Sequence, residues 1–146
     1  MTNANMEVAY RTTDYVVEAV SGQGVGGGEH SLFLRVDTAS QELRALHRRY
    51  GVDCSCFITA CNPFSQPLDE QTNLRRQEAL EAELRRRSLT SLPGAGRHPV
   101  NGWPPEPSFL VLGLALEASK NLGRHYEQNA IVWAGADAVP RLVILA

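Results

Sequence analysis

The fold of this chain is restricted above all by two short, almost wholly apolar runs, residues 54–61 and 109–114. Strands with apolar residues on both faces are typical of the interior of a sheet. Each run is followed by a segment in which apolar residues recur at helical spacing, residues 69–87 and 115–126. The pattern therefore predicts buried strands that alternate with helices packed on a sheet.

Both ends of the chain carry the pattern of a β-hairpin. Residues 15–20 and 31–36 are rich in β-branched and other apolar residues, and they flank a glycine-rich connection at residues 22–28. Residues 130–133 and 141–145 repeat the arrangement around a connection that contains glycine and proline. The sheet is therefore expected to combine hairpins with helical crossovers.

One α+β domain over the whole chain is the fold class that these elements predict. A further helix is expected to begin at Thr38, whose hydroxyl forms a capping box with Gln41. Residues 88–107 contain five of the eight prolines and predict an irregular crossing with room for a short edge strand, while residues 1–9 are expected to form a flexible tail. We therefore expect a single layer of mixed sheet with about six strands and about three helices on one face, in the order β-β-α-β-α-β-α-β-β.

The charge balance argues against two classes of partner. The chain has 14 Lys and Arg against 16 Asp and Glu, so its net charge is -2 and it lacks a basic field for nucleic acid or for an anionic membrane. The longest apolar run, residues 109–116, is too short to span a bilayer. Residues 1–5 have neither the basic nor the apolar region of a secretory signal, which predicts a cytoplasmic location.

The three cysteines, Cys54, Cys56 and Cys61, are expected to be reduced thiols in a buried strand. Alternation along a strand places Cys54 and Cys56 on one face and Cys61 on the other, which argues against a shared zinc site. A nucleophilic Cys61 would need a partner such as His98 or His125 to lower its pKa. No metal and no cofactor is therefore expected.

The inward side of the predicted helix over residues 69–87 changes from apolar to polar. Leu80 is followed, one turn at a time toward the N-terminus, by Gln77 and Asn73. This polar end lies beside Asn62, where the buried strand is expected to end because a proline follows. Inward polar side chains need hydrogen-bond partners, so the pattern indicates a polar cluster at this end of the strand.

Three segments of the chain form a recognisable combination. They are residues 57–60 leading into Asn62 and then Asn73, residues 102–109, and residues 126–131. Together they resemble a bacterial family of proteins of unknown function, numbered 3293, over nearly the whole chain. Because that family has no assigned activity, the resemblance implies a bacterial origin and a single domain and assigns no catalytic residue.

Polar residues of these segments and of the neighbouring loops are expected to meet at the strand ends, where sheets with helical crossovers commonly bind ligands. The candidate binding residues are Thr59, Asn62, Ser65, Asn73, Arg76, His98, Trp103, Glu106, Ser108 and Gln128. The cluster is rich in amides and poor in activated nucleophiles. It therefore predicts first a small-molecule or peptide binding module with a polar cleft near Asn62.

Two other functions stay open at this point. One is a small enzyme in which Glu106 is a general base, while Asn62, Arg76 or His98 holds an anionic group of the substrate. The other is a structural or protein-interaction role, with a homodimer formed through the loop of Trp103 or through a terminal strand edge. The same amides and hydroxyls could instead only satisfy the loop backbone and cap helices.

Overall fold

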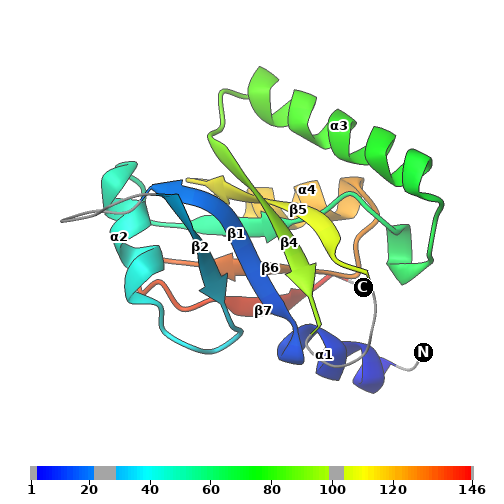
Figure 1. Ribbon diagram of the computed structural model, residues 1–146, viewed down its shortest axis with the longest axis horizontal. Coiled ribbons are helices and arrows are strands. Elements are labelled where there is room, and N and C mark those ends of the chain that lie inside the picture. The colour runs from blue at the N-terminus through cyan, green and yellow to red at the C-terminus, as the bar shows by residue number, and fades with distance from the viewer. Residues whose placement is uncertain (1–2, 22–28, 99–103, 146) are drawn as a thin grey trace.

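A single antiparallel sheet of seven strands organises the residues that the computed structural model describes, which are 3–21, 29–98 and 104–145 (Figure 1). The strands are β1 (Asp14–Ser21), β2 (Glu29–Leu34), β3 (Ser55–Ile58), β4 (Ser91–Arg97), β5 (Glu106–Leu112), β6 (Ala130–Ala134) and β7 (Arg141–Ile144). The helices are α1 (Asn3–Thr12), α2 (Gln41–Arg49), α3 (Glu70–Arg86) and α4 (Leu116–His125), and a 3-10 turn, η1, covers Pro63–Ser65. The strand order across the sheet is β2-β1-β4-β5-β3-β6-β7.

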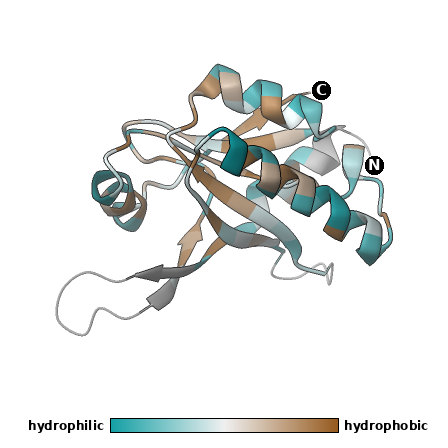
Figure 2. Ribbon diagram, turned by 90° about the horizontal axis from the view of Figure 1, so that it is seen from above, coloured by the Kyte–Doolittle hydropathy of each residue, from teal (hydrophilic) through white to brown (hydrophobic). Residues whose placement is uncertain are grey.

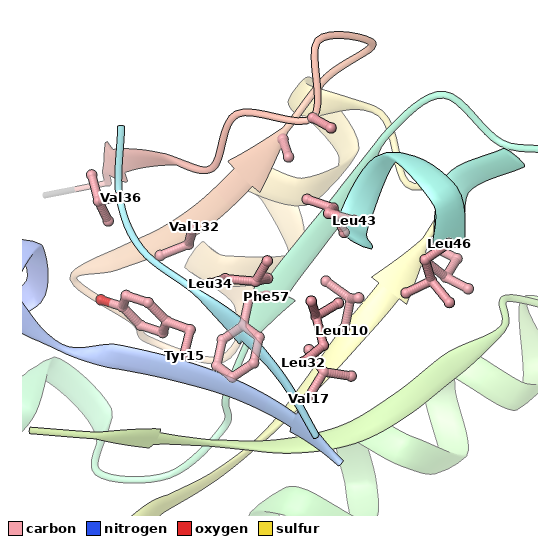
Figure 3. Close-up of a cluster of buried hydrophobic side chains, with 13 residues drawn as sticks. Tyr15, Val17, Leu32, Leu34, Val36, Leu43, Leu46, Phe57, Leu110 and Val132 are labelled. Atoms are coloured by element: carbon pink, nitrogen blue, oxygen red, sulfur yellow. The ribbon is translucent and has the colours of Figure 1, made fainter. Parts of the chain in front are cut away.

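Helices cover both faces of the sheet, because its central strands are apolar on both sides. On β5, Leu110 belongs to one buried cluster together with Leu43 of α2 (Figure 3). The next residue along the strand, Val111, belongs to a second buried cluster with Leu80 of α3 and Leu122 of α4. The helices alternate between hydrophilic and hydrophobic residues, as expected of elements with one buried side (Figure 2). The expectation that all helices lie on one face is therefore wrong.

The predicted class, an α+β fold with a single sheet, is confirmed with two corrections to the sheet. The described residues form seven strands where about six are predicted, and all neighbouring strands pair antiparallel where a mixed sheet is predicted. The extra strand, β4, explains the second difference. It reverses the chain between α3 and β5, so that β5 runs antiparallel to β3, whereas a direct helical crossover would have made these two strands parallel.

The strand β4 lies in the interior of the sheet, between β1 and β5, within the segment predicted as an irregular crossing. Its sequence includes Pro93, which is paired with Phe109 of β5 and cannot donate a backbone hydrogen bond. It also includes Gly94 and Gly96, which weaken strand propensity. The local sequence of β4 therefore does not predict an interior strand. The strand forms because β4 pairs with β1 on one side and with β5 on the other.

The segment expected to be a flexible tail, residues 1–9, is mostly part of helix α1 in the described chain. This helix is anchored near its end by two contacts that are remote in sequence. Arg11 forms an ion pair with Asp37 at 2.6 Å, and the hydroxyl oxygens of Tyr10 and Ser65 lie 3.0 Å apart. A local pattern cannot reveal such anchors, because their partners are distant along the chain.

Most other predicted elements are confirmed, but the helix predicted to begin at Thr38 begins at Gln41 and is capped by Ser40. The helix predicted over residues 69–87 is α3, and its N-terminus is capped by Asp69, whose side chain accepts a hydrogen bond from the backbone of Thr72. Both predicted hairpins are present, as β1 with β2 and as β6 with β7. The glycine-rich residues 22–28 and the candidate Trp103 lie outside the described residues. Of the helices that are described, none is long and apolar enough to cross a membrane.

Candidate functional site

Several of the candidate residues lie together at one edge of the sheet, where β3 ends and its two neighbours begin. Since β3 pairs antiparallel with both β5 and β6, the loop after β3 lies beside the first residues of those strands. This loop contains Asn62 and Ser65, while Glu106 begins β5 and Gln128 precedes β6. Helix α3 follows the loop and adds Asn73 to the group.

Asn62 is the centre of the hydrogen-bond network at this edge. Its side-chain Oδ1 accepts hydrogen bonds from Asn73 Nδ2 at 2.7 Å and from the backbone N–H of Leu68 at 3.0 Å. Its Nδ2 donates to Glu106 Oε2 at 2.8 Å, and its backbone N–H donates to Asn73 Oδ1 at 2.9 Å. The backbone of Asn62 has a φ of 48°, in the left-handed region that asparagine adopts more readily than most residues. The two asparagines thus hold the loop after β3 in one conformation.

Thr59 and Gln77 satisfy the backbone at the end of β3. Gln77 Oε1 accepts a hydrogen bond from the backbone N–H of Ala60 at 3.0 Å. The hydroxyl of Thr59 donates to the carbonyl oxygen of Pro107 at 2.6 Å and accepts from the backbone N–H of Cys61 at 3.0 Å. The hydrogen bonds of these two side chains are therefore explained by a structural role, in which polar side chains satisfy the backbone of the loop.

Arg76 ties α3 to the segment before β6. Its Nε donates to the carbonyl oxygen of Ala60 at 2.6 Å, and its Nη2 donates to the carbonyl oxygen of Tyr126 at 2.7 Å. Its Nη1 lies 3.4 Å from a carboxylate oxygen of Glu127. Gln128 Nε2 donates to the same Tyr126 carbonyl oxygen at 3.1 Å. Each guanidinium nitrogen of Arg76 therefore already has a partner within the chain.

Helix α1 brings two contacts that the sequence pattern does not predict. The Tyr10 hydroxyl lies 3.0 Å from the hydroxyl of Ser65, which also accepts a hydrogen bond from Asn129 Nδ2 at 2.9 Å. The Tyr15 hydroxyl of β1 donates to the carbonyl oxygen of Tyr10 at 2.7 Å. Tyr10 lies just after the expected tail and Asn129 is adjacent to the candidate Gln128. Only the Asn129 position has a signal in the sequence, because an amide pair precedes a predicted strand.

Glu106 differs from the other members of the cluster, because its carboxyl group has a single hydrogen-bond partner among the described residues, Asn62. Within the described chain no lysine, arginine or histidine forms an ion pair with it. Burial raises the pKa of Glu106, and the hydrogen bond from Asn62 lowers it less strongly. The carboxyl group can accept further hydrogen bonds when ionised and can donate one when protonated.

The hydroxyl groups near Glu106 stay protonated at neutral pH. Burial raises the pKa of Tyr10, and the charge of Glu106 raises it further. Burial raises the pKa of Tyr15 as well, again with a smaller contribution from Glu106. The Tyr10 hydroxyl is therefore a neutral group that can donate or accept a hydrogen bond close to this carboxyl.

Two other candidates lie apart from the network around Asn62. His98 Nε2 is 2.9 Å from the hydroxyl of Thr12 on α1. The buried Ser108 donates its hydroxyl to the carbonyl oxygen of Glu106, within its own strand, at 3.0 Å. His98 therefore interacts with α1, and Ser108 with the backbone of β5.

The buried thiols do not have the properties of nucleophiles. Burial raises the pKa of Cys61 and raises that of Cys56 to about 12, which is opposite to the change that a reactive thiolate needs. The Cys61 thiol lies 3.7 Å from the carbonyl oxygen of Pro107 and can donate to it. Among the described residues there is no group of three or more His, Cys, Asp or Glu side chains that could hold a metal ion.

Glu106→Gln is expected to stabilise the protein at neutral pH relative to wild type. Because the pKa of Glu106 is raised in the folded state, the folded protein binds this proton more tightly than the unfolded chain. Wild-type stability should therefore fall as pH rises from the ordinary carboxyl range through the folded-state pKa, and the substitution removes this loss. Urea unfolding at about pH 4 and about pH 7 measures the difference.

The matched control is Glu117→Gln, which removes a charge from an exposed position on α4. Its effect on stability should be small at neutral pH, because the exposed ion pair that it removes, with Lys120, contributes little. If the free energies of unfolding of Glu106→Gln and wild type differ by the same amount at both pH values, the charge of Glu106 does not destabilise the folded protein.

Comparison with known proteins gives one match. A family model described as "Protein of unknown function (DUF3293)" matches residues 58–131, just over half of the chain. The resemblance seen in the sequence is thus confirmed over this range, and a bacterial origin stays a prediction. No curated protein matches the chain, and no solved structure does. The matched range begins at the end of β3 and ends in β6, so it contains Asn62, Asn73 and Glu106.

Proposed function

The chain belongs to this DUF3293 family of proteins of unknown function, and we propose that it is a binding module that holds a small molecule or peptide at the strand ends near Asn62. One observation carries the proposal. Glu106 is a partly buried carboxyl group that has no cationic partner within the described chain. Charges in such positions are normally paired, because their desolvation is costly. A ligand with an ammonium group or other N–H donors would supply the missing partner.

The surroundings of Glu106 support recognition of this kind. Its carboxyl group is oriented by Asn62, which is itself fixed by Asn73 and by the backbone of Leu68. A preorganised acceptor loses little conformational freedom when a ligand binds. The hydroxyl of Tyr10 adds a neutral hydrogen-bonding group beside it. We infer that the site recognises the donor pattern of its ligand through this small set of polar atoms.

A second candidate function is general-base catalysis by Glu106. The raised pKa of this carboxyl supports it, since general bases work best when their pKa lies near the working pH. The anion-holding role that this alternative gives to Arg76 has less support, because Arg76 bonds to Ala60, Tyr126 and Glu127. His98 likewise interacts with Thr12. Binding therefore has the better support.

A thermal-shift screen with amines, amino acid amides, dipeptides, nucleotides and phosphates tests the proposal. Compounds with a free amino group are expected to raise the melting temperature, because they bind the folded state alone. For the strongest hit, isothermal titration calorimetry should give a dissociation constant about tenfold to a hundredfold higher for Glu106→Gln than for wild type, the usual range for a hydrogen bond to a charged group. Glu117→Gln should leave it unchanged.

The acetylated form of the hit is a further control. Acetylation leaves the rest of the compound unchanged but replaces the positive charge with a neutral amide, so the acetylated form should bind much more weakly. A compound that stabilises wild type and Glu106→Gln equally, or whose acetylated form binds as well, would show that Glu106 is not the ligand-binding group.

A further inference from the structure

A groove lies on the α3 side of the sheet, apart from the Glu106 site. It has a volume of about 520 Å³ and runs between α3 and the strands β4 and β5. Neither Glu106 nor Asn62 lines it. Its walls combine apolar surface, carboxylates and one buried amide, and each of these three features limits what it could bind.

The apolar wall of the groove is formed by side chains from three elements. Leu74 of α3 lines the groove and is 57% exposed. Pro93 of β4, Pro107 and Phe109 of β5 complete this wall. Together with the exposed prolines, Leu74 offers apolar surface to a molecule in the groove.

The charged residues that line the groove are all acidic. They are Glu18 of β1 and Glu78 and Glu81 of α3, and no lysine, arginine or histidine lines it. Glu81 forms an exposed ion pair with Arg85 at 3.2 Å. Glu18 and Glu78 form no ion pair within the described chain. The groove therefore presents uncompensated negative charge beside apolar surface, which favours a cationic and partly apolar partner.

The buried amide of Gln77 adds a hydrogen-bond donor. This side chain is 8% exposed and lines the groove, and its Oε1 accepts the backbone N–H of Ala60 at 3.0 Å, which fixes the orientation of the amide. Its Nε2 is buried and has no acceptor in the described part of the chain. A buried donor without an acceptor is unfavourable, and a carbonyl group of a bound molecule would satisfy it.

We propose that this groove binds an extended peptide segment that carries arginine or lysine side chains among apolar ones. A peptide supplies all three complements together. Its apolar side chains pack on Leu74 and the exposed prolines of the groove, its cations lie near Glu18 and Glu78, and a backbone carbonyl accepts from Gln77 Nε2. This site is separate from the one proposed at Glu106 and does not depend on it.

Fluorescence anisotropy with two labelled peptides tests the proposal. The probe is fluorescein-labelled Gly-Leu-Arg-Leu-Arg-Gly amide, and its control carries citrulline, which is uncharged and similar in shape, in place of both arginines. The arginine peptide is expected to bind about tenfold more tightly than the citrulline peptide. Its affinity should fall as ionic strength rises, because exposed charges are screened.

Two sets of variants locate the binding. The double variant Glu18→Gln/Glu78→Gln should raise the dissociation constant about threefold to tenfold, while Glu117→Gln should not change it. Leu74→Ser should raise it about tenfold, while Val8→Ser, which alters a similarly exposed apolar residue on α1, should not. Because all five altered positions are exposed, thermal unfolding should show that every variant is folded.

Three outcomes would overturn the proposal. They are equal affinity for the arginine and citrulline peptides, equal losses in the groove variants and their controls, and no binding at up to about 1 mM peptide. Glu106→Gln separates this proposal from the proposed function, because it should leave peptide binding unchanged. A loss of peptide binding in Glu106→Gln would instead place the peptide at the Glu106 site and contradict the groove.

Discussion

Asn62→Ala is expected to lower the free energy of unfolding by about 4 kcal/mol. The substitution removes the acceptor for Asn73 Nδ2 and for the backbone N–H of Leu68, and it removes the donor to Glu106. Each such bond contributes about 1 kcal/mol, and alanine at a φ of 48° adds a cost of about 1 kcal/mol, since its Cβ is crowded in the left-handed region. Urea unfolding followed by circular dichroism measures the change.

Asn62→Gly separates the two causes of this loss. Glycine also lacks the three side-chain bonds, but it adopts a positive φ without strain. Its free energy of unfolding should therefore exceed that of Asn62→Ala, despite the greater conformational freedom of glycine in the unfolded chain. If alanine is tolerated as well as asparagine, the network around Asn62 does not hold the loop after β3. If glycine is no better than alanine, backbone conformation contributes little.

Loss of Asn62 should also change the chemistry of Glu106. The hydrogen bond from Asn62 is the one contact that lowers the pKa of Glu106 against the effect of burial. In Asn62→Ala this pKa should therefore rise further, so that the carboxyl group is protonated over a wider pH range. A ligand that binds to the ionised form of Glu106 should therefore bind more weakly to Asn62→Ala than to wild type. The same residue thus links the stability of the loop to the charge state of the proposed site.

The apolar pattern of the sequence predicts the interior strands and the helices that follow them, because burial on both faces has a local signature. Residues 54–61 contain β3, residues 109–114 include the second half of β5, and residues 69–87 contain α3. Which strands will pair with each other in the sheet has no such local signature in the sequence. The pattern does not show that β4 would insert next to β5, and its proline and glycines hide it further.

Part of the candidate site was equally visible in the sequence. Gln77 and Asn73 interrupt the apolar side of α3, so polar partners at the end of β3 could be expected, and Asn62 is among them. The sequence does not show which groups are already satisfied. Arg76 is a plausible anion-binding residue by its position, yet its bonds lie within the chain. The sequence also does not show that Glu106 lacks a cationic partner within the described chain. That property depends on where the lysine, arginine and histidine side chains lie in the tertiary structure.

Gly94→Ala is expected to destabilise the protein by about 3 kcal/mol. A methyl group at Gly94 would overlap the carbonyl oxygen of Val16 and would lie 3.0 Å from a ring carbon of Phe57. The first contact is with the backbone of β1, which cannot rotate away as a side chain can. To accept the methyl group, β4 would have to move away from β1 in the middle of the sheet. The midpoint of urea unfolding should fall accordingly, with little change in slope.

Gly96→Ala is the matched control in the same strand. There the added methyl group would meet the nearest atom, Cγ2 of Thr13, at 3.6 Å, an ordinary van der Waals distance. This substitution should be neutral or stabilising by about 0.5 kcal/mol, because alanine has fewer conformations than glycine in the unfolded chain. Equal effects at the two positions would contradict the close approach of β1 and β4. Since Gly94 also lines the groove beside α3, a displaced β4 should weaken peptide binding there as well.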